Sequence, residues 1–272
     1  MMTHFKTPQD GNDMMPYFFG PRPENDKISG WYKDVTMIVI PYVTDEQILK
    51  SIIPEKFALL NDPIVTITYA CNKDIDWLAG RSYNLVSISI KVKFEGKVDK
   101  EEGTLNLVMW ENLTDPILTG RELQGIPKIY ADIKDHQISD ETISTSMSHY
   151  DNTILDISIS NMTQLDDKMV AVISESERNL RSFGIRYLSN VDIMKPPVLN
   201  ESILHTSQNF FKEIHIGKGS LNWYPSSWEK NPTQAHIINK LQDLPILEYK
   251  DSYFIKGATN LFVPDKPSLV LK

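Results

Sequence analysis

Residues 87–94 read SISIKVKF, with an apolar side chain at every second position. A period of two is typical of a β-strand that buries one face and exposes the other to water. Two apolar, β-branched runs precede it, VTMIVIPYV at 35–43 and IVTITYAC at 64–71, and a further candidate strand follows at 104–110. The first half of the chain therefore predicts a group of neighbouring strands.

The second half of the chain also predicts mostly strands. The candidates lie at 130–138, 143–149, 154–159, 186–194 and 203–216, with a final hairpin at 249–255 and 258–263. Helices are expected at 45–53, where Thr44 caps the start, at 117–123, and from Asn231-Pro232 to about 241. The GKGS segment at 217–220 reads as a turn. Because helices do not follow strands regularly, we expect an α+β fold, predominantly antiparallel β, forming a barrel or sheet with a few peripheral helices.

Composition and charge exclude several function classes. The chain has 272 residues and a net charge of −8, and its scattered Lys and Arg form no basic stripe for nucleic acid. No apolar run reaches the ~18 residues of a membrane helix, and the polar N-terminus lacks the pattern of a signal peptide. Cys71 is the only cysteine, and the six histidines show no metal-binding spacing. We expect one domain over 1–272, with an irregular arm at about 1–30, in a soluble cytoplasmic protein without a metal.

One segment carries chemistry: residues 120–128, GRELQGIPK. It resembles the acetoacetate decarboxylase family, whose hallmark is a GRE element followed closely by a Pro-Lys pair. The preceding stretch WENLTDP at 110–116 is similar to that family's approach to the motif, and a looser likeness extends over about 35–263. The resemblance implies an acetoacetate decarboxylase-like fold, a homo-oligomer, no external cofactor, and a catalytic role for Lys128.

The resemblance implies that Lys128 attacks a substrate ketone. A protonated imine accepts an electron pair far better than a ketone does, and lysine is the side chain that forms one. Attack needs a neutral amine, whereas an ordinary lysine has a pKa of about 10.4. Acetoacetate decarboxylase is itself a known example of a lysine activated by desolvation or a neighbouring cation. Ile126, Ile129 and Tyr130 supply apolar surface here, and an extended chain puts Ile126, Lys128 and Tyr130 on one face.

The sequence departs from the family at several positions. The family has a second lysine directly after the first, where this chain has Ile129. Its two upstream glutamates align with Thr68 and Leu85, and its substrate-side arginine falls near Val35. Arg81 and Tyr83 either replace the lost polar groups or lie on the surface, and the surface interpretation is favoured.

These features predict a Schiff-base-forming lyase acting on a keto acid, most directly by decarboxylation of a β-keto acid. Aldolase-dehydratase chemistry on pyruvate-like substrates is the alternative, followed by a non-catalytic small-acid-binding protein or a structural subunit. Arg121 and Glu122 hold the motif turn through an ion pair or contact a substrate carboxylate, and Trp110 and Tyr130 are further candidates for support or substrate binding. The expected partners are a small keto acid and further copies of the chain, not nucleic acid or membrane.

Overall fold

The computed structural model describes residues 7, 14–21, 29–263 and 265–272, so most of the arm expected at 1–30 lies outside the described residues. The strands are β1 Trp31–Val43, β2 Phe57–Leu59, β3 Ile64–Ile75, β4 Arg81–Glu95, β5 Lys100–Glu111, β6 Lys128–Tyr130, β7 Asp132–Ile133, β8 Gln137–Ser139, β9 Thr142–His149, β10 Asn152–Gln164, β11 Asn179–Leu188, β12 Leu199–Trp223, β13 Glu248–Tyr249, β14 Ser252–Asn260 and β15 Leu269–Leu271. The helices are α1 Glu46–Lys50, α2 Thr114–Thr119, α3 Asp167–Ser176 and α4 Ala235–Gln242, with 3-10 turns η1 Tyr17–Phe19 and η2 Asp76–Leu78 and a π-helical turn η3 Gly120–Gln124.

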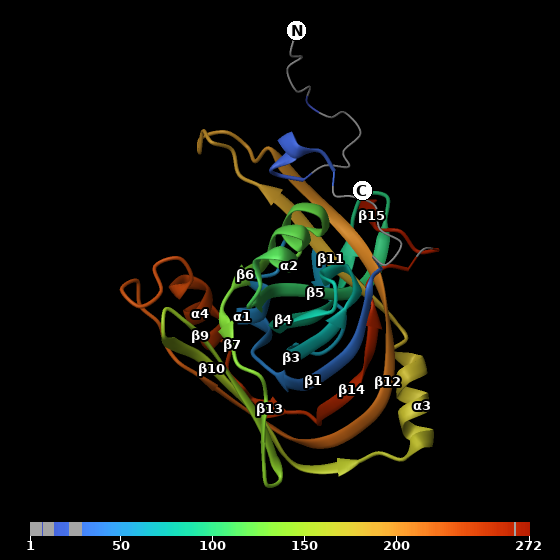
Figure 1. The fold of residues 1–272 in the computed structure, drawn as a ribbon. Helices are drawn as coiled ribbons and strands as arrows, with labels where there is room; N and C mark the ends of the chain where they lie inside the picture. The colour runs from blue at the N-terminus through green and yellow to red at the C-terminus, as the bar shows by residue number, and fades with distance from the viewer. Residues whose placement is uncertain (1–6, 8–13, 22–28, 264) are drawn as a thin grey trace.

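All strands of the described residues belong to one sheet, in the order β11-β5-β4-β3-β1-β14-β12-β10-β9-β7, with short strands paired beside this path. Neighbours are antiparallel except at β5–β6 and β5–β11. Strand β11 pairs with both β5 and β12, so the path of strands returns on itself. Figure 1 shows the long β12 sweeping along one side of the molecule, with α3 on its outside. The predicted class, mostly antiparallel β with a few peripheral helices, is confirmed.

The alternation at 87–94 sets the main core. Ile88, Ile90, Val92 and Phe94 are each at most 2% exposed and join one large cluster with Trp110. Two smaller apolar clusters lie apart from it, one around Tyr32, Val35, Ala70, Ile75 and Tyr83, the other around Val170, Ile214 and Ile255. Cys71 is buried in the main cluster, as its apolar surroundings predict.

Several local predictions are wrong. The last hairpin is absent, because residues 252–260 form the single strand β14. The GKGS segment lies inside β12 rather than in a turn. Asp45, not Thr44, caps α1 by accepting from the Ile48 amide. Helix α4 begins at Ala235, after a turn at Asn231, and α3 was not expected from the sequence.

No helix in the described part of the chain is long and apolar enough to cross a membrane.

Candidate active site

Lys128 opens the short strand β6, which runs parallel to β5. Lys128 is the register partner of Met109, and Ile129 is the partner of Trp110. Successive side chains of a strand point to opposite faces. Ile129 packs against the main core with Trp110, so Lys128 projects from the other face, the one that also carries Glu111. The motif lysine is therefore directed away from the main core and toward the smaller cluster around Tyr83.

The Lys128 ammonium is buried beside a buried carboxylate. Lys128 is 6% exposed, and its Nζ lies 2.8 Å from Oε1 of Glu111, which is 0% exposed. Nζ also donates to the Pro116 carbonyl at 3.2 Å. Beyond this ion pair, neither Glu111 oxygen accepts a directed hydrogen bond from the described residues. The two groups form a buried ion pair at the lysine that the motif indicates.

Burial raises the pKa of the Glu111 carboxyl, and the charge and hydrogen bond of Lys128 oppose that rise. Desolvation disfavours the charged carboxylate, whereas a nearby cation favours it. The lysine charge therefore favours the ionised carboxylate, and the burial opposes it. Glu111 is not among the site residues predicted from the sequence, although a single acid at the end of the apolar run LVMW of 107–110 was a signal for a role.

Two tyrosine hydroxyls lie near this pair. Tyr83 and Tyr32 are 5% and 4% exposed, their hydroxyl oxygens are 3.3 Å apart, and Trp77 Nε1 donates to the Tyr32 hydroxyl at 3.0 Å. Burial raises the pKa of both phenols, and the negative charge of Glu111 adds to the rise. The favoured surface interpretation is therefore wrong for Tyr83. It holds for Arg81, which is exposed and donates to the Leu78 carbonyl.

The rest of this face is mostly apolar, but two buried polar atoms at or near it have no hydrogen-bond partner among the described residues. Val35 is 2% exposed, and Leu85 is the register partner of Glu111 across β4 and β5. Asn72 lies opposite Val35 in β1 and is 4% exposed, yet its Nδ2 has no hydrogen-bond partner among the described residues. The buried Oγ1 of Thr119, next to the GRE element, has none either. Unpaired buried polar atoms are costly, so they are candidates for contacts with a ligand.

The glycine of the GRE element gives the lysine its space. A Cβ at Gly120 would lie 2.6 Å from both Cδ and Cε of Lys128, far inside normal contact. Gly125 ends the turn with φ of 68°, in the left-handed region that glycine adopts without strain. The two glycines therefore have separate tasks: one admits the lysine side chain, and the other reverses the chain before Pro127.

Arg121 holds the turn, but not by the expected ion pair. Its Nη1 donates to the Lys128 carbonyl at 2.8 Å, which ties the start of the motif to its end. Glu122 is exposed, and its backbone carbonyl accepts from Arg186 Nε at 3.0 Å. The Gly125 carbonyl accepts from the Ile185 amide at 2.7 Å. Strand β11, far away in sequence, thus fixes the outer side of the turn.

Trp110 and Tyr130 are joined to each other through Gln234. Trp110 is fully buried in the main core, and its Nε1 donates to Gln234 Oε1 at 2.8 Å. Gln234 in turn donates to the Tyr130 carbonyl at 2.8 Å, so it joins β5, β6 and the start of α4. The Tyr130 side chain is 40% exposed and donates to Asp132 Oδ1. Of the two roles that the sequence left open, support fits both residues.

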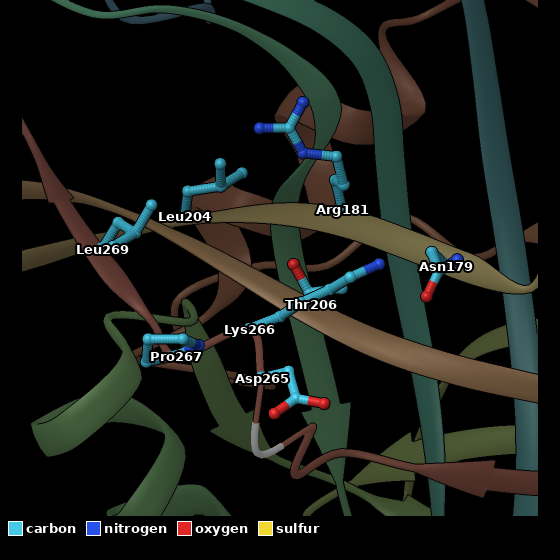
Figure 2. A pocket seen from close by; sticks show the side chains of 8 residues that line it. All are labelled: Asn179, Arg181, Leu204, Thr206, Asp265, Lys266, Pro267 and Leu269. Carbon is cyan, nitrogen blue, oxygen red and sulfur yellow. The ribbon is translucent and has the colours of Figure 1, made fainter.

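Two cavities lie outside the lysine face. One of about 340 Å³ lies between the β11–β12 pair and the C-terminal segment, and Figure 2 shows the eight side chains around it, among them Arg181, Thr206 and Lys266. The other, about 140 Å³, lies behind the motif turn against Gly125 and Pro127. Lys128 lines neither of them.

Known proteins share this fold and sequence pattern. The sequence model of the acetoacetate decarboxylase family matches residues 14–267. "Decarboxylase DEC1" of Cochliobolus heterostrophus is 27% identical over 234 residues, which cover 84% of this chain and 83% of that protein.

The solved structures agree on the fold. An acetoacetate decarboxylase from Legionella pneumophila is 21% identical, with a TM-score of 0.71 over 97% of this chain and 94% of that one. Another acetoacetate decarboxylase structure is 18% identical, with a TM-score of 0.75 over 95% of each chain. The enduracididine biosynthesis enzyme MppR complexed with pyruvate is 14% identical, with a TM-score of 0.64 over 89% of this chain and 90% of that one. Because the family model spans nearly the whole sequence, this chain belongs to the acetoacetate decarboxylase family.

Proposed function

We propose that this protein is a Schiff-base-forming lyase that decarboxylates a β-keto acid through Lys128. One observation carries the proposal: Lys128, at the end of the family motif, is buried, and its amine lies 2.8 Å from the buried carboxylate of Glu111. Membership of the acetoacetate decarboxylase family and the likeness to a decarboxylase of Cochliobolus heterostrophus support the reaction class.

The reaction begins with proton transfer from the Lys128 ammonium to Glu111, which leaves a neutral amine. The amine attacks the ketone carbon, and the carbinolamine loses water, with Glu111 returning its proton to the departing oxygen. The product is an iminium ion with the negative Glu111 carboxylate beside it. The bond between the substrate's α-carbon and the substrate's own carboxylate then breaks. Its electron pair enters the iminium system, and carbon dioxide leaves. The enamine carbon then takes a proton from solvent, and hydrolysis of the resulting iminium ion by water releases the ketone and restores the Lys128 ammonium.

Glu111 supplies the acid–base function from a strand different from those of the family's upstream glutamates. By the sequence match, those glutamates correspond to Thr68 and Leu85. Leu85 and Glu111 are register partners in adjacent strands, so a carboxylate missing from β4 is present on β5 at the same level. The contact between Lys128 and Glu111 supports a site in which one buried carboxylate receives the lysine proton and then faces the iminium charge.

A second candidate is aldolase-dehydratase chemistry on a pyruvate-like substrate. The buried hydroxyls of Tyr83 and Tyr32 near Glu111 favour it, because aldol addition and dehydration need proton donors at a substrate oxygen. The structural likeness to MppR, solved with pyruvate, points the same way. The two candidates differ in products: one releases carbon dioxide, and the other forms a new C–C bond and an enone absorbance.

Borohydride trapping tests the proposal. The protein is incubated with acetoacetate, acetopyruvate, pyruvate and longer keto acids, reduced, and analysed by intact mass and peptide mapping. We expect one adduct on Lys128 that is absent in Lys128→Ala and retained in Lys134→Ala, an exposed lysine six positions along. Released carbon dioxide identifies the decarboxylase. No adduct from any carbonyl on folded protein would refute the proposal and favour a non-catalytic small-acid-binding protein.

A further inference from the structure

A buried histidine far from the motif in sequence contacts the motif turn. His205, in β12, is 9% exposed. Its Nε2 lies 2.7 Å from the Gln124 carbonyl oxygen, at the end of η3, and its Nδ1 lies 2.7 Å from the hydroxyl of Ser268, just before β15. The ring therefore joins the lysine turn to the C-terminal segment.

The hydrogen-bond partners determine the state of the ring. A carbonyl oxygen only accepts, so Nε2 carries the proton and donates to Gln124. Burial lowers the pKa of His205, and the bond to the Gln124 carbonyl partly opposes this, so the neutral ring prevails at pH 7. In the neutral ring Nδ1 has a free lone pair, which accepts from the Ser268 hydroxyl. Both ring nitrogens are thus satisfied in one orientation, which fixes the ring.

This contact completes a set of three on the motif turn. The carbonyls of Glu122, Gln124 and Gly125 accept from Arg186, His205 and the Ile185 amide respectively. Carbonyls at the end of a helical turn have no partner within the helix, so partners from β11 and β12 decide how the turn sits. Close packing reinforces them, since a side chain at Gly184 in β11 would collide with the Gln124 carbonyl oxygen.

We propose that His205 is a positioning residue for Lys128, holding the Gln124 carbonyl so that the motif turn presents the lysine amine to Glu111. Gln124 lies four residues before Lys128, with Gly125 between them as the bend. Without the His205 bond, the motif turn loses one of its three fixed carbonyls, and Lys128 is held less firmly in position. Misplacement by about 1 Å is enough to lower a rate about 10²-fold. This inference rests on the proposed function for its catalytic consequence only.

The test compares His205→Leu, His205→Gln and a control, His136→Leu. Glutamine keeps an N–H donor and an oxygen acceptor, whereas leucine has neither. His136 contacts Tyr69 and Phe254, away from the motif turn. Each variant is measured by amide hydrogen exchange over residues 120–128 without substrate, and by the rate of adduct formation at Lys128 as a function of carbonyl concentration.

We expect His205→Leu to speed exchange over 120–128 at least ~10-fold and to slow adduct formation ~10–100-fold, with half-saturation changed less than ~3-fold. His205→Gln restores both within ~3-fold, and His136→Leu leaves both unchanged. The proposal is overturned if His205→Leu folds and keeps the wild-type rates of exchange and adduct formation. It is also overturned if His205→Gln folds but does not bring these two rates back toward the wild-type values. If wild type forms no adduct at all, the proposed function fails and the exchange result alone decides the role of His205. If His205→Leu does not fold, His205→Asn, which is too short to span both partners, replaces it.

Discussion

The space that Gly120 leaves for the lysine can be tested without disturbing the fold. Gly120 has φ of −67° and ψ of −37°, an ordinary helical conformation that alanine also adopts. Replacing glycine by alanine inside a helix gains up to about 1 kcal/mol, so Gly120→Ala has no backbone reason to unfold the protein. The new Cβ would nevertheless lie 2.6 Å from Cδ and Cε of Lys128, where ordinary contact begins at 3.4 Å. The lysine must therefore retreat by the difference, about 0.8 Å.

A displacement of this size separates activity from stability. Moving a reacting group by about 1 Å costs about 10²-fold in rate, so we expect Gly120→Ala to trap the keto acid ~10–100-fold more slowly. Crowding of the lysine offsets the helical gain by about 1–3 kcal/mol, so the free energy of unfolding should change little or fall slightly. Borohydride trapping gives the rate and urea unfolding gives the stability. Leu118→Ala in the preceding helix α2 is the control, because Leu118 is 46% exposed. Wild-type trapping by folded Gly120→Ala refutes the close fit between the glycine and the lysine.

Individual contacts of Glu111, His205 and Trp110 can each be tested by one substitution. Glu111→Gln leaves the Lys128 charge buried without a counter-ion, so chemical unfolding should show a loss of about 3–5 kcal/mol in the free energy of unfolding, and trapping should slow. The double variant Glu111→Leu with Lys128→Met should lose less stability than Glu111→Leu and Lys128→Met lose in sum. Because His205 has a folded pKa below its ordinary 6.5, its contribution to stability is present above 6.5 and is lost as pH falls through the lower value. Wild type should therefore lose more stability than His205→Gln between pH 7 and pH 5, and equal losses would contradict this. Trp110→Phe removes the donor to buried Gln234, so thermal unfolding should show a loss of about 1–3 kcal/mol in the free energy of unfolding. High salt should not recover this loss.

The strands of the first half could be predicted because their signal is local. Burial of one face follows from the period of two in residues 87–94, and eight residues are enough to reveal that period. The buried residues are Ile88, Ile90, Val92 and Phe94. A local pattern is misleading at the predicted final hairpin, whose two strands were expected to be separated at residues 256–257, where Gly257 lies. A side chain there would collide with the Phe210 carbonyl of β12, so the glycine permits close approach of two strands within a continuous β14. Local sequence does not distinguish a glycine needed for a turn from one needed for contact.

The candidate site divides in the same way. The motif indicates Lys128, Arg121 and the two glycines, because these residues lie within nine positions of one another. The acid beside the lysine and the histidine behind the turn depend on which strands pair and in what register. Strand β6 pairs with β5 in parallel, an arrangement that no alternation pattern specifies, and β12 reaches the turn from about 80 residues away in sequence. Long-range pairing therefore supplies the residues that set the electrostatics.

The strand register also changes how the missing second lysine is understood. From the sequence, Ile129 in place of a lysine suggested that a cation beside Lys128 was lost. Adjacent residues of a strand point to opposite faces, and Ile129 packs with Trp110 against the main core, while Lys128 meets Glu111 on the other side. A lysine at 129 would thus have its stem directed into the core rather than toward the amine at 128. The charge that faces Lys128 in this protein is the carboxylate of Glu111 on the neighbouring strand β5. Isoleucine at 129 contributes by anchoring the strand that presents the lysine.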